Sequence, residues 1–499
     1  MKRMIVVLSV LAAGLSLFAN GSAETAAPVV QKTIESTGPV ELTIAIKSKN
    51  NGFPENVKDD YAYQKILAKT GVAVNFQVID DYYTALNVRI AGGDCPDLFQ
   101  CDSPHMRTFA DNGEILDLTK YKNKELSNLL KWIGGADINA FVHGGKLYGI
   151  PKSYVNSATY TLLNVRQDWL DKLGLTVPKT VDDVYKVAYA FTYNDPDGNG
   201  KNDTIGYSGK APYGFEPIAN AYDTALGNYI IVRDGKVTNT LSQPHMKEAL
   251  AECKKFVDAK IVDPDMYTTS PRDKAISGTI GLVSMEWSLL YKQSYQDQVR
   301  KVNPQAKWSF FGPLASEVSA AAALLPIDPA SSSNFLCVSA DISPEKLAAV
   351  FRLVDYLTSE EGSMLVNFGL KGVHWDEDAN GVRSMTKRAS EANYVATYQL
   401  LGRDEDTYLA MKFKEAADQV SYAKKMPHIT VYNSLITEPE GFYLDDFEKY
   451  VKTQLIAFIY GDRPISEYDK FLGELDSVYG FDKYMAAAAE QMKGYGYIK

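Results

Sequence analysis

Alternating apolar and polar positions predict a parallel β-sheet in the first part of the chain. Residues 40–46 (VELTIAI), 72–79 (VAVNFQVI) and 96–100 (PDLFQ) have the short, β-branched pattern of strands. Residues 58–70 and 82–92 lie between them and have a helical pattern. An alternation of strands and helices produces parallel strands covered by helices. We therefore expect a βαβαβ unit whose ligand-binding loops follow the carboxyl ends of its strands.

A second α/β unit is predicted from residue 157 onward. Residues 159–165 (TYTLLNV) and 278–285 (GTIGLVSM) are predicted strands. Thr180 is placed to cap a helix with apolar residues at helical spacing up to Phe191, and residues 246–259 form a further helix. The small, Pro- and Ser-rich residues 319–332 indicate a return crossing. Ser343 and Pro344 then begin another helix, and the chain from residue 388 is helical and Tyr-rich.

The first 39 residues have the pattern of an export signal followed by a leader. Lys2 and Arg3 precede an apolar stretch from residue 4 to 19, and small residues end at Ala23. We expect residues 1–23 to be a signal peptide and residues 24–39 a flexible leader. The first cysteine of the chain is Cys95, so no Cys follows the apolar stretch to accept a lipid. The mature protein is expected to be exported, periplasmic or extracellular, and soluble.

Composition and charge exclude several classes of function. The 499 residues include 52 Lys and Arg against 62 Asp and Glu, which gives a net charge of −10. A general nucleic-acid binder needs a basic face, so nucleic acid is not an expected partner. All four cysteines are expected to be reduced: Cys95 and Cys101 bracket the predicted strand 96–100, Cys253 lies on the apolar face of a predicted helix, and Cys337 lies in a strand-like stretch. No CxxC or HExxH motif indicates a zinc site.

Four separated stretches resemble one known family. They are LLNVRQDWLDKLGLTVPKT (162–180), DYLTSEEGSMLVNFGLKGVHW (355–375), GGDCPDLFQ (92–100) and KLYGIP (146–151). They are similar to the extracellular solute-binding proteins of ABC importers, family 1, and within it to the large oligosaccharide-binding subgroup that includes alginate-binding proteins. The similarity extends from about residue 40 to the end of the chain.

The resemblance implies a fold and a partner. The implied fold is α/β and two-lobed, periplasmic-binding-protein-like of type II, with mixed sheets flanked by helices and a helical C-terminal part. Residues 40–156 with about 323–378 are expected to form lobe 1, and residues 157–322 with about 379–499 lobe 2. The lobes would close over a small molecule or oligosaccharide, and a monomer would deliver it to the membrane permease subunits of an ABC importer.

Residues 195–206 (DPDGNGKNDTIG) have the spacing of an EF-hand-type calcium loop. Positions 1, 3, 5, 7 and 9 are Asp195, Asp197, Asn199, Lys201 and Asp203, with Gly200 at the sharp turn. Lys201 would contribute its backbone carbonyl. Position 12 is Gly206 instead of the bidentate Glu, and related proteins often place a ligating Glu where this chain has Thr204. A plain polar turn is the alternative to a structural Ca²⁺ site.

Aromatic and polar residues in predicted loops are candidates for carbohydrate binding. Sugar rings pack their C–H faces on aromatic rings, while amides and carboxylates bond the hydroxyls. Both Trp287, beside Glu286 at a strand end, and Trp375 are candidates for stacking, with core packing as the alternative. Five polar candidates occupy the predicted crossing to the second lobe or loops of the first lobe: Tyr154, Asn156, Asp102, Ser103 and Asn50.

Catalysis is the weaker interpretation. No GxSxG nucleophile elbow or phosphate-binding loop is present, and the five histidines show no triad-like spacing. The protein is therefore expected not to be an enzyme. Two alternatives remain open at this point: a secreted polysaccharide-cleaving enzyme, since 62 carboxylates include chance pairs, and a sensor that hands its ligand to a receptor.

Overall fold

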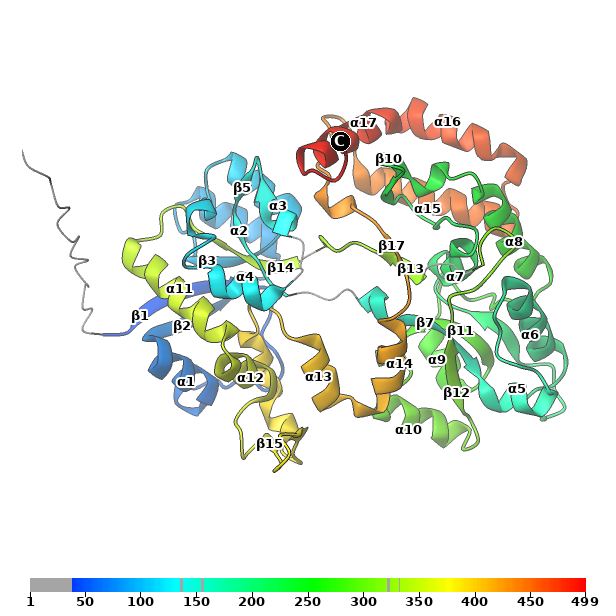
Figure 1. The fold of residues 1–499 in the computed structure, drawn as a ribbon, viewed down its shortest axis with the longest axis horizontal. Coiled ribbons are helices and arrows are strands. Elements are labelled where there is room, and N and C mark those ends of the chain that lie inside the picture. The colour runs from blue at the N-terminus through cyan, green and yellow to red at the C-terminus, as the bar shows by residue number, and fades with distance from the viewer. Residues whose placement is uncertain (1–37, 135–137, 154–156, 321–323, 332) are drawn as a thin grey trace, which may run out of the picture. The chain divides into compact units, whose positions relative to one another are not determined.

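Two mixed β-sheets, each flanked by helices, organise the chain (Figure 1). The computed structural model describes residues 38–134, 138–153, 157–320, 324–331 and 333–499. Residues Pro39–Lys499 pack into one unit that contains both sheets. The predicted signal peptide and nearly all of the predicted leader lie outside the described residues.

The first sheet has five strands in the order β2-β1-β3-β14-β6. Its strands are β1 (Val40–Ile46), β2 (Val72–Val78), β3 (Leu98–Asp102), β6 (Gly149–Ile150) and β14 (Ser333–Val338). β1 pairs in parallel with β2 and with β3, whereas β14 is antiparallel to β3 and β6. With α1 (Tyr61–Thr70) and α2 (Tyr82–Ala91) as the connecting helices, the predicted βαβαβ unit is confirmed. The third strand begins two residues later than predicted.

The second sheet has four strands in the order β12-β7-β11-β8. They are β7 (Thr161–Arg166), β8 (Ile205–Ser208), β11 (Ile280–Glu286) and β12 (Trp308–Phe311). β11 is parallel to β8, and β7 is antiparallel to both β11 and β12. The carboxyl ends of β8 and β11 therefore lie at the same edge of the sheet as the start of β7.

Local capping determines where several helices begin. Thr180 accepts a hydrogen bond from the Asp183 amide at 3.0 Å, and the Asp183 carboxylate accepts one from the Thr180 amide at 3.0 Å. This capping box starts α6 (Val181–Tyr193) where it was predicted. Ser343 likewise caps α11 (Pro344–Thr358), with Pro344 in its first turn. Further helices on the sheets are α3 (Ser103–Asp111), α4 (Ser127–Ile133), α5 (Gln167–Leu173), α7 (Glu216–Asn220), α8 (Met246–Asp258), α9 (Pro271–Ser277), α10 (Gln293–Val302) and α12 (Glu360–Phe368).

Two connecting segments run side by side as a short parallel pair. β13 (Leu324–Ile327) follows the second sheet and leads to β14 of the first, and it pairs with β17 (His428–Thr430). β17 comes after α13 (Glu405–Lys412) and α14 (Ala417–Ala423). Two small hairpins, β9 (Ile230–Arg233) with β10 (Lys236–Asn239) and β15 (Trp375–Glu377) with β16 (Arg383–Met385), complete the strands that position the sites below.

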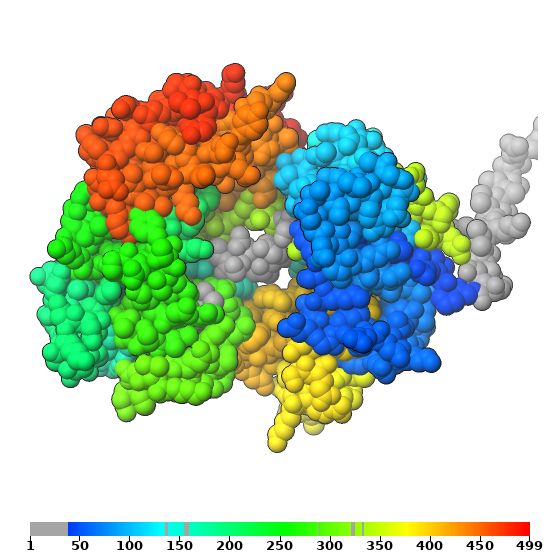
Figure 2. All heavy atoms as spheres, turned by 180° about the vertical axis from the view of Figure 1, so that it is seen from behind, coloured from blue at the N-terminus to red at the C-terminus, as the bar shows by residue number. Residues whose placement is uncertain are grey.

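The C-terminal helices pack on elements of the second α/β unit. α15 (Leu444–Tyr460) packs on α8, α16 (Tyr468–Tyr479) follows it, and α17 (Phe481–Gly494) packs on β10. Figure 2 shows these orange and red residues lying against the green segment. Phe447, Leu455 and Phe458 of α15 are buried, which explains the apolar spacing of the tail.

Two chemical expectations can be checked in the described residues. All four cysteines are free thiols; three are buried and Cys95 is half-buried. No helix among the described residues is both long and apolar enough to cross a membrane.

Candidate functional site

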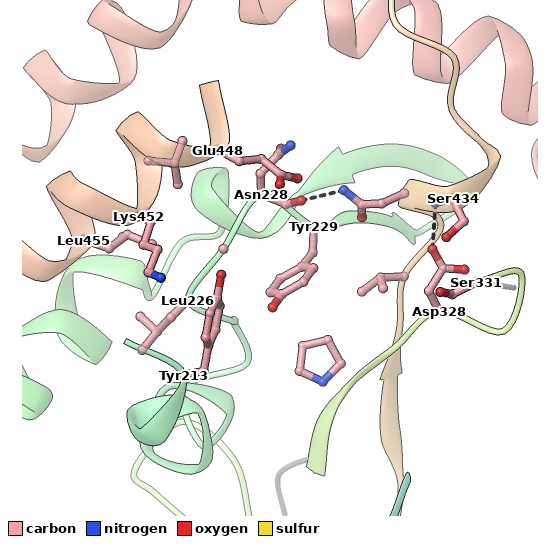
Figure 3. Close-up of a pocket in the computed structure, with 15 residues that line it drawn as sticks. Tyr213, Leu226, Asn228, Tyr229, Asp328, Ser331, Ser434, Glu448, Lys452 and Leu455 are labelled. Atoms are coloured by element: carbon pink, nitrogen blue, oxygen red, sulfur yellow. Dashed lines mark hydrogen bonds between the residues drawn. The ribbon is translucent and has the colours of Figure 1, made fainter. Parts of the chain in front are cut away.

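A cavity of about 350 Å³ lies beside the two connecting segments, and it combines aromatic and polar side chains (Figure 3). Its lining comes from three parts of the chain: residues 213–229 between β8 and β9, residues 326–331 and 431–434 of the connecting segments, and α15. The lining residues used below are Tyr213, Gly227, Asn228, Tyr229, Asp328, Ser331, Asn433, Ser434, Glu448 and Lys452.

Two tyrosine rings face the cavity. Tyr213 begins a 3₁₀ turn (Tyr213–Phe215) after β8 and is 42% exposed, and Tyr229 directly precedes β9. In Figure 3 both rings point into the space between the turn and α15. The Lys452 Nζ atom lies 5.8 Å from the Tyr213 ring centroid, within the range of a cation–π contact.

A buried carboxyl group holds the loop that carries Tyr229. The Leu226 amide donates to both carboxyl oxygens of Glu216, each at 3.0 Å. Glu216 is only 1% exposed, and its burial raises its pKa to about 8, opposed by the hydrogen bond from Leu226. Glu216 is therefore an anchor of the loop, held mostly in its neutral form at pH 7.

Hydrogen bonds tie the connecting segments to this loop. The Asn433 side chain donates to the Asn228 carbonyl at 2.6 Å and accepts from the Ile230 amide at 2.9 Å. The buried Asp328 carboxylate accepts from the Ser434 amide at 2.7 Å and from the Ala330 amide at 2.9 Å. These bonds join β9, β13 and β17 into one framework around the cavity.

The arrangement suits a polar solute with apolar faces. Two aromatic rings offer flat apolar surfaces. Carboxylates, amides, two serine hydroxyls and one ammonium group surround them, without a nucleophile–base pair among the lining residues used here. Such a combination is typical of sites that bind sugars.

The first sheet gathers a second group of polar residues at the carboxyl ends of its strands. Asp102 caps α3, where it accepts from the His105 amide at 3.1 Å and contacts His105 Nδ1 at 2.7 Å. Although partial burial opposes the change, hydrogen bonds from His105 and Tyr83 lower the pKa of Asp102 to about 2. The Tyr83 ring stacks on His105 with centroids 3.5 Å apart, and Lys47 Nζ lies 4.7 Å from its centroid.

The other first-sheet candidates, Ser103 and Asn50, differ in exposure. Ser103 is 4% exposed and donates to the Ala140 carbonyl at 3.2 Å. Asn50 is exposed, and its backbone amide donates to the Thr397 hydroxyl at 3.0 Å. Two further candidates, Tyr154 and Asn156, lie outside the described residues.

Trp287 and Trp375 are both buried and line different cavities. Each is only 6% exposed. Trp287 packs on Phe413 with ring centroids 4.7 Å apart and borders a cavity of about 210 Å³ that also includes Glu286, whose carboxylate bonds the Ser288 hydroxyl. Trp375 donates from Nε1 to the Gly369 carbonyl at 3.1 Å and borders a separate cavity of about 610 Å³ beside α12. Their assignment to the solute site stays a prediction.

The predicted calcium loop folds around its own carboxylates. Asp195 accepts from the amides of Gly198 and Asn199 at 3.0 Å and of Gly200 at 3.1 Å. The Asn199 side-chain nitrogen lies 2.8 Å from Asp197 Oδ2 and 3.2 Å from Asp203 Oδ1. The Asn199 side-chain nitrogen thus lies between the Asp197 and Asp203 carboxylates, while the Asp195 carboxylate faces backbone amides of the same loop. Carboxylate oxygens are the kind of ligand that Ca²⁺ prefers. Within the described residues, however, no group of three His, Cys, Asp or Glu side chains has the geometry of a metal site.

Packing on α6 explains why the end of the loop departs from an EF-hand. Thr204 is 5% exposed and its hydroxyl donates to the Phe191 carbonyl at 2.7 Å, so it points into the protein and not toward the loop. A Cβ at Gly206 would lie 2.0 Å from the Ala188 carbonyl oxygen. Thr204 therefore points away from the loop, and position 12 has no room for a glutamate.

Sequence reasoning missed Tyr213, Tyr229, Tyr83 and His105. The first two occur in the loops APYGF and LGNYI, where Gly, Pro and Asn break the regular pattern. A tyrosine in such a loop, after a strand of the second sheet, was the sequence signal that could have identified these two residues as site candidates.

Two curated relatives are named for the carbohydrates that they bind. The chain is 27% identical over 276 residues to the fructooligosaccharide ABC transporter substrate-binding protein of Streptococcus pneumoniae, a match that covers 50% of this chain and 51% of that one. It therefore spans about half the length of that relative. It is 25% identical over 415 residues to a polygalacturonan/rhamnogalacturonan-binding protein of Bacillus subtilis, covering 79% and 80% of the two chains.

Solved structures share the fold over almost the whole chain. An HMO-binding, ABC-transporter-associated solute-binding protein of Bifidobacterium longum infantis has a TM-score of 0.70 at 18% identity, covering 93% of this chain and 100% of that one. An EF-hand mutant of the Streptococcus pneumoniae protein with fructo-nystose has a TM-score of 0.63 at 18% identity, covering 92% and 99%. An alginate-binding protein without calcium ion has a TM-score of 0.64 at 15% identity, covering 91% and 98%.

The predicted fold class is confirmed by these structures, because they are two-lobed solute-binding proteins with mixed sheets and flanking helices. The family model for bacterial extracellular solute-binding proteins matches residues 47–364, which is more than half of the chain. The protein belongs to the bacterial extracellular solute-binding protein family.

Proposed function

We propose that this protein captures an oligosaccharide at the cavity lined by Tyr213 and Tyr229 and delivers it unchanged to an ABC importer. The observation that carries the proposal is the pairing of two exposed or half-buried aromatic rings with carboxylate and amide groups in one cavity. Family membership and the carbohydrate ligands named for the two curated relatives support it.

The position of the cavity suggests how binding is signalled. Asp328 and Ser331 precede the first sheet's β14, and Asn433 and Ser434 follow β17, so the solute contacts segments that connect the two sheets. A ligand that contacts both sides of a hinge favours the closed state of a pre-existing equilibrium. Closure then presents the loaded form to the permease subunits.

The proposed lobes follow the two sheets. We keep residues 40–156 with about 323–378 as lobe 1 and residues 157–322 with about 379–499 as lobe 2. Two ring contacts favour placing the end of the second lobe 1 segment later than residue 378. Tyr394 lies 5.3 Å from Tyr61 and Tyr398 lies 5.9 Å from Phe53, measured between ring centroids. The first-sheet loop residues Asn50, Asp102 and Ser103, the pair Glu286 and Trp287, and Trp375, Tyr154 and Asn156 remain proposed contacts of the solute.

Export and partners follow from the same function. The N-terminal pattern of Lys2, Arg3 and the apolar stretch is proposed to direct the chain out of the cytoplasm. We propose that the protein is a monomer and works with importer permease subunits. We also propose that it neither binds nucleic acid nor acts as an enzyme.

A structural calcium ion is proposed at residues 195–203. Asp195, Asp197, Asn199 and Asp203 would hold it by side-chain oxygens and Lys201 by its carbonyl oxygen. The ion would neutralise three carboxylates of the loop and stiffen the segment between α6 and β8. The EF-hand mutant and calcium-free structures of fold relatives support this proposal.

The direct test is a binding screen with product analysis. The purified protein is titrated by calorimetry with neutral and acidic oligosaccharides, and each mixture is then separated by chromatography. Saturable binding with unchanged saccharide supports the proposal. Cleaved products support the polysaccharide-cleaving alternative instead, and the absence of any binding contradicts the proposed function.

A further inference from the structure

The cavity lined by Tyr213 and Tyr229 carries more negative than positive charge. Asp328 and Glu448 both line it, and Glu438 and Asp445 act on Glu448 from nearby. Lys452, one turn after Glu448 on α15, is the cationic side chain among the described lining residues. An anionic solute would therefore face two carboxylates and one ammonium group.

Neither carboxylate is neutralised by an ion pair within the described residues. The oxygens of Asp328 accept from backbone amides of Ser434 and Ala330. Partial loss of solvent and the neighbouring Asp445 and Glu438 carboxylates raise the pKa of Glu448, so its surroundings are acidic and not basic. On the Ser434 side, the Arg107 guanidinium is occupied by the carbonyls of Ser434 and Ile436, to which it donates at 2.6 and 3.1 Å.

Carboxylates without an ion-pair partner favour the binding of hydroxyl groups and disfavour the binding of other carboxylates. Each oxygen accepts hydrogen bonds from sugar hydroxyls, and a charge-assisted bond of that kind is stronger than a neutral one. A uronic acid carries a carboxylate on the ring itself, and like charges held close together repel. Because Glu448 and Lys452 are solvent-exposed at the rim, salt will screen part of this repulsion.

We propose that this cavity selects uncharged oligosaccharides over uronic-acid oligosaccharides of the same size, with Glu448 and Asp328 as the residues that discriminate. The inference rests on the proposed function, since it assigns the ligand class of the same cavity. It distinguishes between the two kinds of carbohydrate named for the curated relatives, fructooligosaccharide and polygalacturonan.

The test compares saccharides that differ in charge. Trigalacturonate and its methyl ester have one skeleton and differ in their carboxylates, and kestose and galactotriose extend the neutral set. We expect the best neutral ligand to bind at least about tenfold more tightly than trigalacturonate at low salt. The ratio should shrink as ionic strength rises, because screening removes the repulsion.

Two variants assign the discrimination to residues. Glu448→Gln keeps the shape of the side chain and should reduce the ratio by about fivefold, and Glu448→Lys should reduce it further. The matched control is Glu345→Gln, an exposed residue in the first turn of α11, which should leave the ratio unchanged. The melting temperature of each variant establishes that it is folded before it is titrated.

The outcomes separate this inference from the proposed function. Tighter binding of trigalacturonate than of its ester and of every neutral saccharide overturns the inference while the proposed function stands. An unchanged ratio in both Glu448 variants overturns the assignment to Glu448. If no saccharide of either kind binds the wild-type protein, the proposed function itself fails.

Discussion

Gly227 and Tyr229 are in such close contact that a Cβ atom on residue 227 would lie 2.7 Å from Cε2 of the Tyr229 ring. Real Cβ atoms essentially never approach another heavy atom that closely, so the absence of a side chain at residue 227 is what lets the ring lie where it does. This contact connects a backbone feature of the loop to the proposed aromatic surface of the site.

Gly227→Ala should therefore weaken solute binding more than its small size suggests. The added methyl group displaces the Tyr229 ring, and overpacking of this kind costs about 1–3 kcal/mol of stability. Calorimetry with the best oligosaccharide and thermal unfolding are the measurements. Gly473→Ala in α16 is the control, since a Cβ there meets open space and alanine favours a helix. Equal affinity of Gly227→Ala and wild type would remove Tyr229 from the site.

Tyr213→Ala and Tyr229→Ala should each weaken oligosaccharide binding by about 1–3 kcal/mol, because each removes apolar ring surface from the site. The affinities are measured by calorimetry at one salt concentration. Tyr189→Ala removes a tyrosine that is 48% exposed on α6, away from the lining residues, and should bind as wild type does. If Tyr189→Ala loses as much affinity as the cavity variants, a general effect of tyrosine removal and not stacking explains the loss.

The stability of the wild-type protein should fall as pH rises from about 4.5 to about 8 because of Glu216. Its pKa is raised to about 8 in the fold, so over this range the folded state binds a proton that the unfolded state has released. The free energy of unfolding then decreases by up to about 1.4 kcal/mol per pH unit. Glu216→Gln, which still accepts from Leu226 but does not titrate, should lack this decrease.

Urea unfolding at several pH values between 5 and 8 measures the effect. The difference between Glu216→Gln and wild type should favour the variant increasingly as pH rises. Glu345→Gln, at an exposed position, should follow the wild-type curve. Parallel curves for Glu216→Gln and wild type would show that Glu216 is not a buried neutral acid.

Calcium should raise the melting temperature of the wild-type protein, and a chelator should reverse the increase, because binding to the folded state alone stabilises it. Asp197→Ala removes one of the proposed carboxylate ligands and should abolish the response to Ca²⁺. Asp418→Ala, an exposed residue of α14, should keep the full response. A wild-type protein that melts at the same temperature with Ca²⁺ and with chelator has no such site.

Regular elements were predictable because their signals come from residues close together in the sequence. The alternation in residues 40–46 and the pairing of Thr180 with Asp183 act over two to four positions, and both predicted elements are confirmed. The spacing of Asp195, Asp197 and Asp203 is equally local, and hydrogen bonds within the loop hold Asp197 and Asp203 to the Asn199 side chain, while the calcium site itself stays a prediction. Its closing residues were not predictable, because the directions of Thr204 and Gly206 depend on packing against α6.

The sequence by itself determined the two α/β units, the family and the place of the acidic loop. Only the tertiary structure decided which residues share a cavity. Tyr213, Tyr229, Asp328, Ser434 and Glu448 are separated by up to 235 positions, and no spacing rule extends so far. They meet because Asn433 bonds Asn228 across 205 positions and Asp328 bonds Ser434 across 106. Similarly, the burial of Trp287 and Trp375 results from long-range packing, which no pattern of neighbouring residues specifies.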